Sequence, residues 1–372
     1  MKVLAFTFTP ASYWSAKYRI YAFGEALRRI GVQFDYDALP YAEYDSGRLQ
    51  IQKYGALAGV LYYLGPLKLR RVYRMLRCSS RYDVVLVQRS LFPGDYTGLE
   101  ELLAEVDPPL VYDFDDALFT LPVHLRPANW DRDPNVLGEL QKVRKLVQAS
   151  RAVIAGNRYL ADYARHYNAN VEVVPTPVDT VRLAPKYTAR DPSRIVIGWL
   201  GTWGNLHYLG ALKPVLQALS ERYPIVVKLI CERSIDLGVR VVRQDWSEQT
   251  EAEDISSFDI ALMPLQDDDW TRGKCGFKLL KYMSAGVPSV ASRVGINAEI
   301  IRDGENGFLA ADEHEWVDKL ARLIKDRQLR QKLSHNGRKT VIEDYSLETL
   351  APKFHDVLAR VAGSSSGRME GS

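Results

Sequence analysis

Short apolar runs alternate with amphipathic stretches along the first half of the chain. Residues 2–9 form a continuous apolar run, and an amphipathic stretch from Lys17 to Ile30 follows and is closed by Gly31. The first run predicts a buried strand, and the stretch after it predicts a helix with a glycine at its end. Further buried strands are predicted at three runs, Tyr82–Gln88, Leu110–Tyr112 and Ala152–Ala155. This alternation is typical of a parallel sheet covered by helices.

The alternation of apolar runs and amphipathic stretches begins again after residues 175–192, a proline-rich stretch without periodicity. A helix is predicted from Leu206 to Ser220, and strands are predicted at residues 195–200, 226–231, 239–242 and 260–264. Strands and helices that alternate in this way predict a second doubly wound α/β domain. We therefore expect two α/β domains with a boundary within the proline-rich stretch.

The stretch from Gly273 to Ala310 combines a helix, a strand and glycine turns. Lys278–Ala285 predicts a helix that Gly286 ends, and Val287–Ala291 predicts the next strand. Cys275 precedes this helix, at a point where free backbone N–H groups favour an anion. On spacing alone, an ordinary strand-and-helix unit with solvated lysines explains the pattern equally well.

The sequences GVPSVAS and EIIRDGENGFLA within this stretch resemble the donor-binding signature of family-4-type retaining glycosyltransferases of the GT-B architecture. Two acids of that signature are replaced here, by Gly273 and Lys281, so the chain resembles a divergent branch. The resemblance implies an α/β fold of two Rossmann-like domains that face a central cleft.

The resemblance also implies the domain organisation. Residues 1–180 would form the acceptor-side domain and residues 190–346 the nucleotide-sugar-binding domain. A helix over residues 347–362 would cross back to the N-terminal domain. Residues 363–372 are short, polar and rich in glycine and serine, and are interpreted as an appended tail.

The activity implied by the resemblance is transfer of a sugar, of hexosyltransferase type, from a nucleotide-diphosphate-sugar donor to a hydroxyl acceptor. The acceptor would be a glycan, a lipid-linked molecule or a small molecule. The family transfers with retention of configuration and without a metal, so we expect no metal site and no cofactor beyond the co-substrate. Loss of both family glutamates leaves open a non-catalytic protein that binds sugar nucleotides.

A glycine loop follows the first predicted strand of the second domain. Gly201 frees the backbone, Thr202 offers a hydroxyl, and Asn205 is placed to cap the next helix. Lys278 is predicted to neutralise the diphosphate as charge develops on it. Lys17 and Arg19 are predicted to add positive charge from across the cleft. The expected donor-binding residues are Gly201, Thr202, Asn205, Lys274, Cys275, Gly276, Phe277, Lys281 and Glu299.

Three aspartates, Asp113, Asp115 and Asp116, follow the strand in VYDFDDALF. The motif resembles the nucleophile motif of haloacid-dehalogenase-type phosphatases, in which the first acid would attack phosphorus and the second would be the acid/base. In the glycosyltransferase interpretation, the aspartates would orient the acceptor hydroxyl or the donor sugar. At least one of them is expected simply to cap the following turn.

Composition limits the function and the cellular compartment that we expect for the protein. A net charge of +3 argues against a general nucleic-acid binder. Three widely spaced cysteines indicate a reduced, cytoplasmic compartment. A helix N-terminus would lower the thiol pKa of Cys275 and make it reactive, whereas close packing beside a ligand is the alternative. We find no apolar run long enough to span a bilayer.

Residues 68–81 carry six basic residues and no acid, with apolar residues interleaved. Such a segment predicts peripheral contact with anionic lipid at the inner face of the membrane, or a grip on a polyanionic or lipid-linked acceptor. A solvated basic face explains the same residues.

Overall fold

The computed structural model describes residues 1–11, 14–38, 73–74, 81–91, 108–126, 130–132, 134–186 and 193–366. The chain forms two compact units. Unit 1 comprises Met1–Pro177, Gly273–Cys275 and Leu350–Ser372, and unit 2 comprises Val178–Arg272 and Gly276–Thr349.

Unit 1 is built on a six-stranded parallel sheet with strand order β2-β1-β3-β4-β5-β6. Its strands are β1 (Lys2–Thr7), β2 (Gln33–Ala38), β3 (Val84–Gln88), β4 (Leu110–Phe114), β5 (Ala152–Ala155) and β6 (Val171–Val173). Every residue of β3, β4 and β5 is buried. Strands covered on both faces are expected to be apolar throughout, which explains the continuous runs in the sequence.

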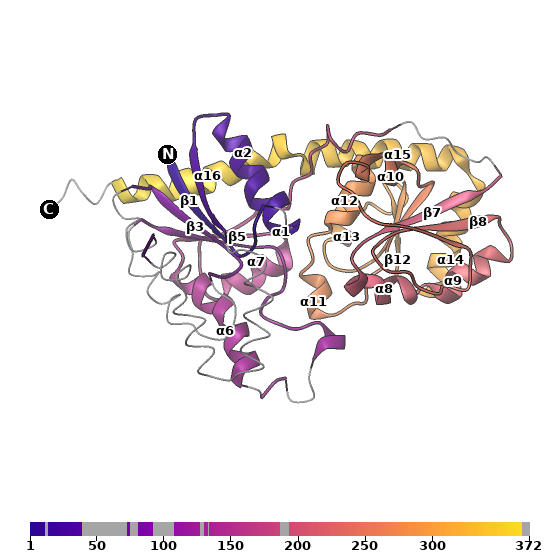
Figure 1. The fold of residues 1–372 in the computed structure, drawn as a ribbon, viewed down its shortest axis with the longest axis horizontal. Helices are drawn as coiled ribbons and strands as arrows, with labels where there is room; N and C mark the ends of the chain where they lie inside the picture. The colour runs from indigo at the N-terminus through magenta and orange to yellow at the C-terminus, as the bar shows by residue number, and fades with distance from the viewer. Residues whose placement is uncertain are drawn as a thin grey trace. The chain divides into compact units, whose positions relative to one another are not determined.

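Helices cover both faces of this sheet (Figure 1). The helical elements of unit 1 are α1 (Trp14–Ala16), a π-helical turn (Lys17–Tyr21), α2 (Ala22–Arg28), a 3-10 turn (Val123–Leu125), α6 (Pro134–Ala149), α7 (Arg158–Arg165) and most of α16 (Leu347–Ser366). Phe23 of α2 stacks on Phe354 of α16 with ring centroids 4.3 Å apart. The helix predicted from Lys17 to Ile30 thus forms in two parts, and Gly31 follows it with a φ of 86°.

Unit 2 repeats the plan with strand order β12-β11-β10-β7-β8-β9, again all parallel. Its strands are β7 (Ile195–Leu200), β8 (Ile225–Ile230), β9 (Val241–Gln244), β10 (Ile260–Met263), β11 (Ser289–Ser292) and β12 (Phe308–Ala310). Its helical elements are a 3-10 turn (Trp203–Asn205), α8 (Leu206–Gly210), α9 (Lys213–Ser220), α10 (Glu251–Ser256), α11 (Asp269–Arg272), α12 (Phe277–Ser284), α13 (Asn297–Ile300), α14 (Glu313–Lys325), α15 (Arg327–Thr340) and a π-helical turn (Val341–Tyr345).

Two apolar clusters fill the two faces of the unit 2 sheet. One cluster joins the sheet to α8, α9 and α14, and the other joins it to α10, α12 and α13 (Figure 1). The helix predicted over Leu206–Ser220 is broken, and Pro214 lies in the first turn of its second part. Proline lacks a backbone N–H and is tolerated in a first turn, which explains why a new helix begins there.

Helix α16 continues to Ser366, beyond the end at residue 362 that the resemblance implied. The interpretation of residues 363–372 as an appended tail stays a prediction. Of the basic segment 68–81, only residues 73, 74 and 81 are described, and Arg74 pairs with Asp37 at 3.2 Å. Within the described ranges, no helix is long and apolar enough to cross a membrane.

Candidate functional site

A buried ion pair lies beside the carboxyl end of β4 in unit 1. Arg19 Nε donates to both carboxylate oxygens of Asp113, at 2.7 and 2.9 Å, and both side chains are 0% exposed. Burial raises the pKa of Asp113 to about 6, against the opposing effect of the Arg19 charge. Both carboxylate oxygens of Asp113 are buried and bonded to Arg19, so Asp113 is not placed to attack phosphorus. Arg19 is likewise enclosed in the fold, which corrects its predicted role as a charge facing a ligand.

Asp115 is held differently from Asp113. Ser15 Oγ donates to Asp115 Oδ2 at 2.6 Å, and Gln88 Nε2 donates to Ser15 Oγ at 2.7 Å. Asp115 Oδ1 is buried and has no hydrogen-bond partner among the described residues. A carboxylate oxygen left in this state is an available acceptor, because buried polar atoms are normally paired. Asp115 therefore keeps one carboxylate oxygen that no described residue uses.

Asp116 accepts a hydrogen bond from Arg89 Nη2 at 3.0 Å. Arg89 has a φ of 65°, a left-handed conformation that is unfavourable for a side chain with a Cβ. The Tyr112 hydroxyl donates to the Arg89 carbonyl oxygen at 2.7 Å and holds the backbone there. Burial raises the pKa of Asp116, and the charge of Arg89 opposes that shift. The turn after β3 thus fixes this third aspartate.

Other buried polar atoms of unit 1 are unpaired. Arg19 Nη2 and Gln88 Oε1 have no hydrogen-bond partner within the described part of the chain, and neither has Thr9 Oγ1. Unpaired buried donors and acceptors are rare in folded proteins, and a ligand or a water commonly completes them. The described residues therefore leave both donors and acceptors unsatisfied in the interior of unit 1.

The residues just before α12 belong to unit 1. Asn157 caps α7, because its Oδ1 accepts from Leu160 N at 2.8 Å, and its Nδ2 donates to the carbonyl oxygen of Lys274 at 2.9 Å. Cys275 Sγ donates to the carbonyl oxygen of Asp115 at 3.1 Å. Burial raises the pKa of the Cys275 thiol well above its usual value. Of the two alternatives for Cys275, the structure therefore disfavours the reactive thiol, because burial disfavours the thiolate.

In unit 2, the glycine loop after β7 has its own internal bonding. Asn205 Nδ2 donates to Thr202 Oγ1 at 3.0 Å, and its side chain makes no capping bond to α8. The prediction that Asn205 caps this helix is therefore wrong. Gly201 lies against the Trp199 ring, since a Cβ added to it would lie 2.4 Å from that ring.

Helix α12 begins at a left-handed glycine. Gly276 has a φ of 64° and is the N-cap residue, and as a glycine it has no side chain to cap the helix. The ammonium of Lys278, in the first turn, lies 4.5 Å from the centroid of the Trp199 ring. Trp199 therefore brings Lys278 and Gly201 together at the carboxyl end of β7. Backbone N–H groups and a lysine in this arrangement favour an anion.

Lys281 is buried in the interior of unit 2. Its ammonium bonds to Glu251 Oε1 at 2.7 Å, and the two side chains are 1% and 0% exposed. Burial alone would raise the pKa of Glu251, yet the charge of Lys281 and the hydrogen bonds that Glu251 accepts lower it. Lys281 is thus part of the core of unit 2, which corrects its predicted contact with the donor.

The remaining predicted residues differ in exposure. Phe277 is half-buried beneath the ammonium of Lys281, 4.6 Å from it, and Glu299 is exposed on α13. Lys17 is half-buried with its ammonium 5.7 Å from the Tyr18 ring. Lys274 belongs to unit 1, where its charge lowers the pKa of Asp116.

Several residues of the site were not predicted. Gln88 could have been found, because a polar residue ends an otherwise apolar strand. Ser15, Arg89 and Trp199 give no such signal in the sequence.

Comparison with known proteins extends this description. Residues 223–326 match the family model for glycosyl transferases group 1. A segment of 84 residues is 30% identical to N-acetyl-alpha-D-glucosaminyl L-malate synthase from Bacillus anthracis and covers 22% of each chain. A longer alignment, 28% identical over 292 residues, matches MMP alpha-(1->4)-mannosyltransferase from Mycolicibacterium hassiacum and covers 70% of this chain and 66% of that protein. The chain thus aligns with less than two thirds of either relative.

Solved structures resemble almost the whole chain. Sucrose-phosphate synthase from Thermosynechococcus elongatus has a TM-score of 0.70 at 13% identity, with 98% of this chain and 100% of that chain covered. HepE of Anabaena in complex with UDP and glucose has a TM-score of 0.65 at 15% identity, with 97% and 100% covered. These structural likenesses, at 13% and 15% identity, show the fold of the chain. The predicted GT-B fold is confirmed.

Proposed function

We propose that this chain transfers a sugar from a nucleotide-diphosphate-sugar donor to a hydroxyl acceptor, with retention of configuration and without a metal. The observation that carries the proposal is the junction of β7 and α12, where Lys278 and Gly201 meet at Trp199. Residues 223–326, which match glycosyl transferases group 1, contain the whole of α12. The neighbouring structure of HepE holds UDP and glucose, which supports a nucleotide sugar as the donor.

The donor diphosphate would bind to unit 2 at the first turn of α12. The first backbone N–H groups of the helix would donate to phosphate oxygens, and Lys278 would neutralise charge as the diphosphate leaves. The Trp199 ring beside the ammonium would hold the lysine in place by a cation–π contact. In a metal-independent reaction, these protein groups would supply the stabilisation of the leaving diphosphate.

The acceptor hydroxyl would be oriented by unit 1. Asp115 is held by Ser15 on one oxygen, and its other oxygen has no partner among the described residues. That oxygen can accept a hydrogen bond from the acceptor hydroxyl and so direct the hydroxyl oxygen to the sugar. Asp113 and Asp116 would keep the strand end and the turn in place through their arginine partners.

The experiment incubates the purified protein with UDP-glucose, GDP-mannose and UDP-N-acetylglucosamine and a panel of hydroxyl acceptors, with EDTA present. Proton NMR of the product gives the anomeric configuration directly. We expect one donor to yield a product with the configuration of the donor. Product of inverted configuration, or activity that EDTA abolishes, would contradict those parts of the proposal. Donor binding without any product would instead indicate a protein that only binds sugar nucleotides.

A further inference from the structure

A cavity of about 370 Å³ lies wholly within unit 2 and apart from the residues of the proposed transfer. Gln266 follows β10, Ser292 ends β11 and Asp312 follows β12, so its walls include the carboxyl ends of three neighbouring strands. Tyr208 of α8 and Trp316 of α14 close it from the helical side. Ligands of doubly wound folds bind at the carboxyl edge of the sheet, and the volume suits a small ligand.

Two aromatic side chains of this cavity have polar atoms without a partner. Tyr208 is 4% exposed and Trp316 is 5% exposed, yet neither the hydroxyl nor the indole N–H makes a hydrogen bond to any described residue. Neither atom is among the completely buried polar atoms, so each reaches accessible space. Buried tyrosine and tryptophan side chains usually find a partner for these groups. Because both residues line the cavity, a molecule bound in it can supply the missing partners.

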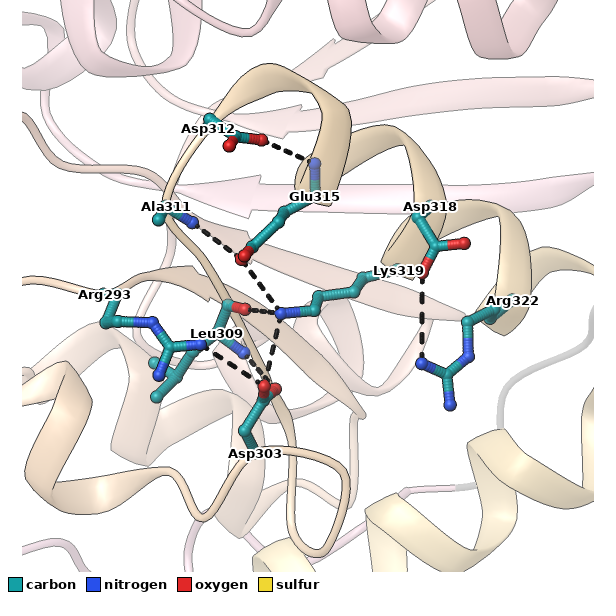
Figure 2. A network of polar contacts seen from close by, with 9 residues as sticks. All are labelled: Arg293, Asp303, Leu309, Ala311, Asp312, Glu315, Asp318, Lys319 and Arg322. Carbon is teal, nitrogen blue, oxygen red and sulfur yellow. Dashed lines mark hydrogen bonds and ion pairs between the residues drawn. The ribbon is translucent and has the colours of Figure 1, made fainter.

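The cavity wall formed by the segment between β12 and α14 is fixed by a polar network (Figure 2). Lys319 bonds to Asp303 at 3.2 Å and to Glu315 at 3.1 Å, and Glu315 accepts from the backbone N–H of Ala311 at 3.0 Å. Asp312 caps α14 by accepting from the Glu315 N–H at 2.8 Å. These bonds tie the segment after β12 to the first turns of α14. The hydrogen-bond acceptors of this segment are therefore held in place before a ligand binds.

The charge of the cavity selects the class of ligand. Its lining residues include the acidic Asp312 and Glu313 and the amide-bearing Gln266, and neither lysine nor arginine is among them. Two carboxylates disfavour a phosphate or any other anion. Carboxylate and amide oxygens accept hydrogen bonds from hydroxyl groups, while Tyr208 and Trp316 can donate to hydroxyl oxygens. Apolar residues such as Leu212 complete the lining and suit C–H groups.

We propose that this cavity binds a neutral saccharide unit through Tyr208, Trp316 and the carboxylate wall of Asp312 and Glu313. The site is separate from the donor site of the proposed function and does not depend on it. A sugar held here would anchor a glycan on unit 2 without taking part in the chemical step.

The test measures binding of methyl α-glucoside, methyl α-mannoside and methyl N-acetyl-α-glucosaminide by saturation-transfer NMR and titration calorimetry. Ala211→Trp fills the cavity from an exposed position in its lining, and Ser220→Trp adds the same ring at an exposed position outside the lining. We expect at least one glycoside to bind wild type and the Ser220 variant alike, and Ala211→Trp to bind about tenfold more weakly or worse. Binding of no glycoside by wild type, or equal binding by the Ala211 variant, would overturn the proposal.

Tyr208→Phe removes only the unpartnered hydroxyl. We expect glycoside affinity to fall by about two- to tenfold, as for one lost hydrogen bond, with the melting temperature unchanged. Unchanged glycoside affinity would overturn the assignment of Tyr208. Lys278→Ala separates this site from the donor site, because it should leave glycoside binding intact; a parallel loss would place the sugar at the donor site and overturn the inference. Stronger binding of tryptamine than of every glycoside would overturn it in favour of a cation site.

Discussion

Arg19 and Asp113, which lie 94 positions apart in the sequence, form a fully buried ion pair with Arg19 Nε bonded to both carboxylate oxygens. The pair connects the helical segment after β1 to the carboxyl end of β4. A second bond runs from Arg19 Nη1 to the carbonyl oxygen of Val174 at 2.9 Å. This one arginine therefore joins three separate parts of unit 1 beneath the candidate acceptor site.

Replacing Arg19 with methionine should destabilise unit 1 strongly. The change leaves the Asp113 carboxylate buried without a counter-charge, and breaking one side of such a pair costs about 3–5 kcal/mol. Urea unfolding followed by circular dichroism measures the loss. Arg165→Met is the matched control, because the Arg165–Asp162 pair is exposed, and it should change the free energy of unfolding by less than about 0.5 kcal/mol. Equal effects of the two variants would contradict the account.

The pH dependence of stability should carry the signature of Asp113. Its pKa in the folded state, about 6, lies above the unfolded value of about 3.9, so the folded state binds more protons between these values. The contribution of this group to stability therefore falls as pH rises from about 4 to about 6 and is constant above that. We expect the free energy of unfolding of wild type, relative to Asp113→Asn, to increase as the pH is lowered through this window. A difference independent of pH would show that the carboxyl titrates normally.

Asp115→Asn should reduce turnover without loss of stability. The amide keeps the shape of the side chain but orients an acceptor hydroxyl poorly, and loss of a group of this kind costs about 10²–10⁴-fold in rate. The measurement compares the transfer rate and the melting temperature with those of wild type. Asp162→Asn, on the exposed surface of α7, is the control and should retain full activity. A fully active Asp115 variant would remove this residue from the site.

Lys278→Ala should lower turnover by about two orders of magnitude or more, because the ammonium that neutralises the leaving diphosphate is lost. The measurement is the steady-state transfer rate at saturating donor. Lys325→Ala removes an equal charge from the exposed end of α14 and should have little effect. A near-normal rate for the Lys278 variant would rule out its assignment.

The sequence predicts the repeating parts of this fold well because they follow local rules. Buried strands such as β5 appear as apolar runs, and Asn157 has the side chain that an N-cap requires. Contacts between distant residues follow no local rule. Nothing near Arg19 indicates that Asp113 is its partner, and nothing near Lys281 indicates that Glu251 draws it into the core.

The candidate site was predicted only in outline for the same reason. The three aspartates were found, but their different environments depend on Ser15, Arg19 and Arg89, which tertiary folding brings to them. Two opposing effects act on the thiol pKa of Cys275. Its position before α12 predicts a lowered pKa, whereas its burial raises the pKa. Burial of a single side chain could not be inferred from its neighbours in the sequence.

The most direct test of nucleotide-sugar transfer is thermal stabilisation of the protein by UDP, GDP, ADP, CMP and their sugars, with and without EDTA. A ligand that binds the native state raises the melting temperature by mass action. We predict a clear rise with one nucleoside diphosphate, unchanged by EDTA and lost in Lys278→Ala. No rise with any nucleotide, for a protein that is folded and unfolds cooperatively, would contradict the proposed donor site.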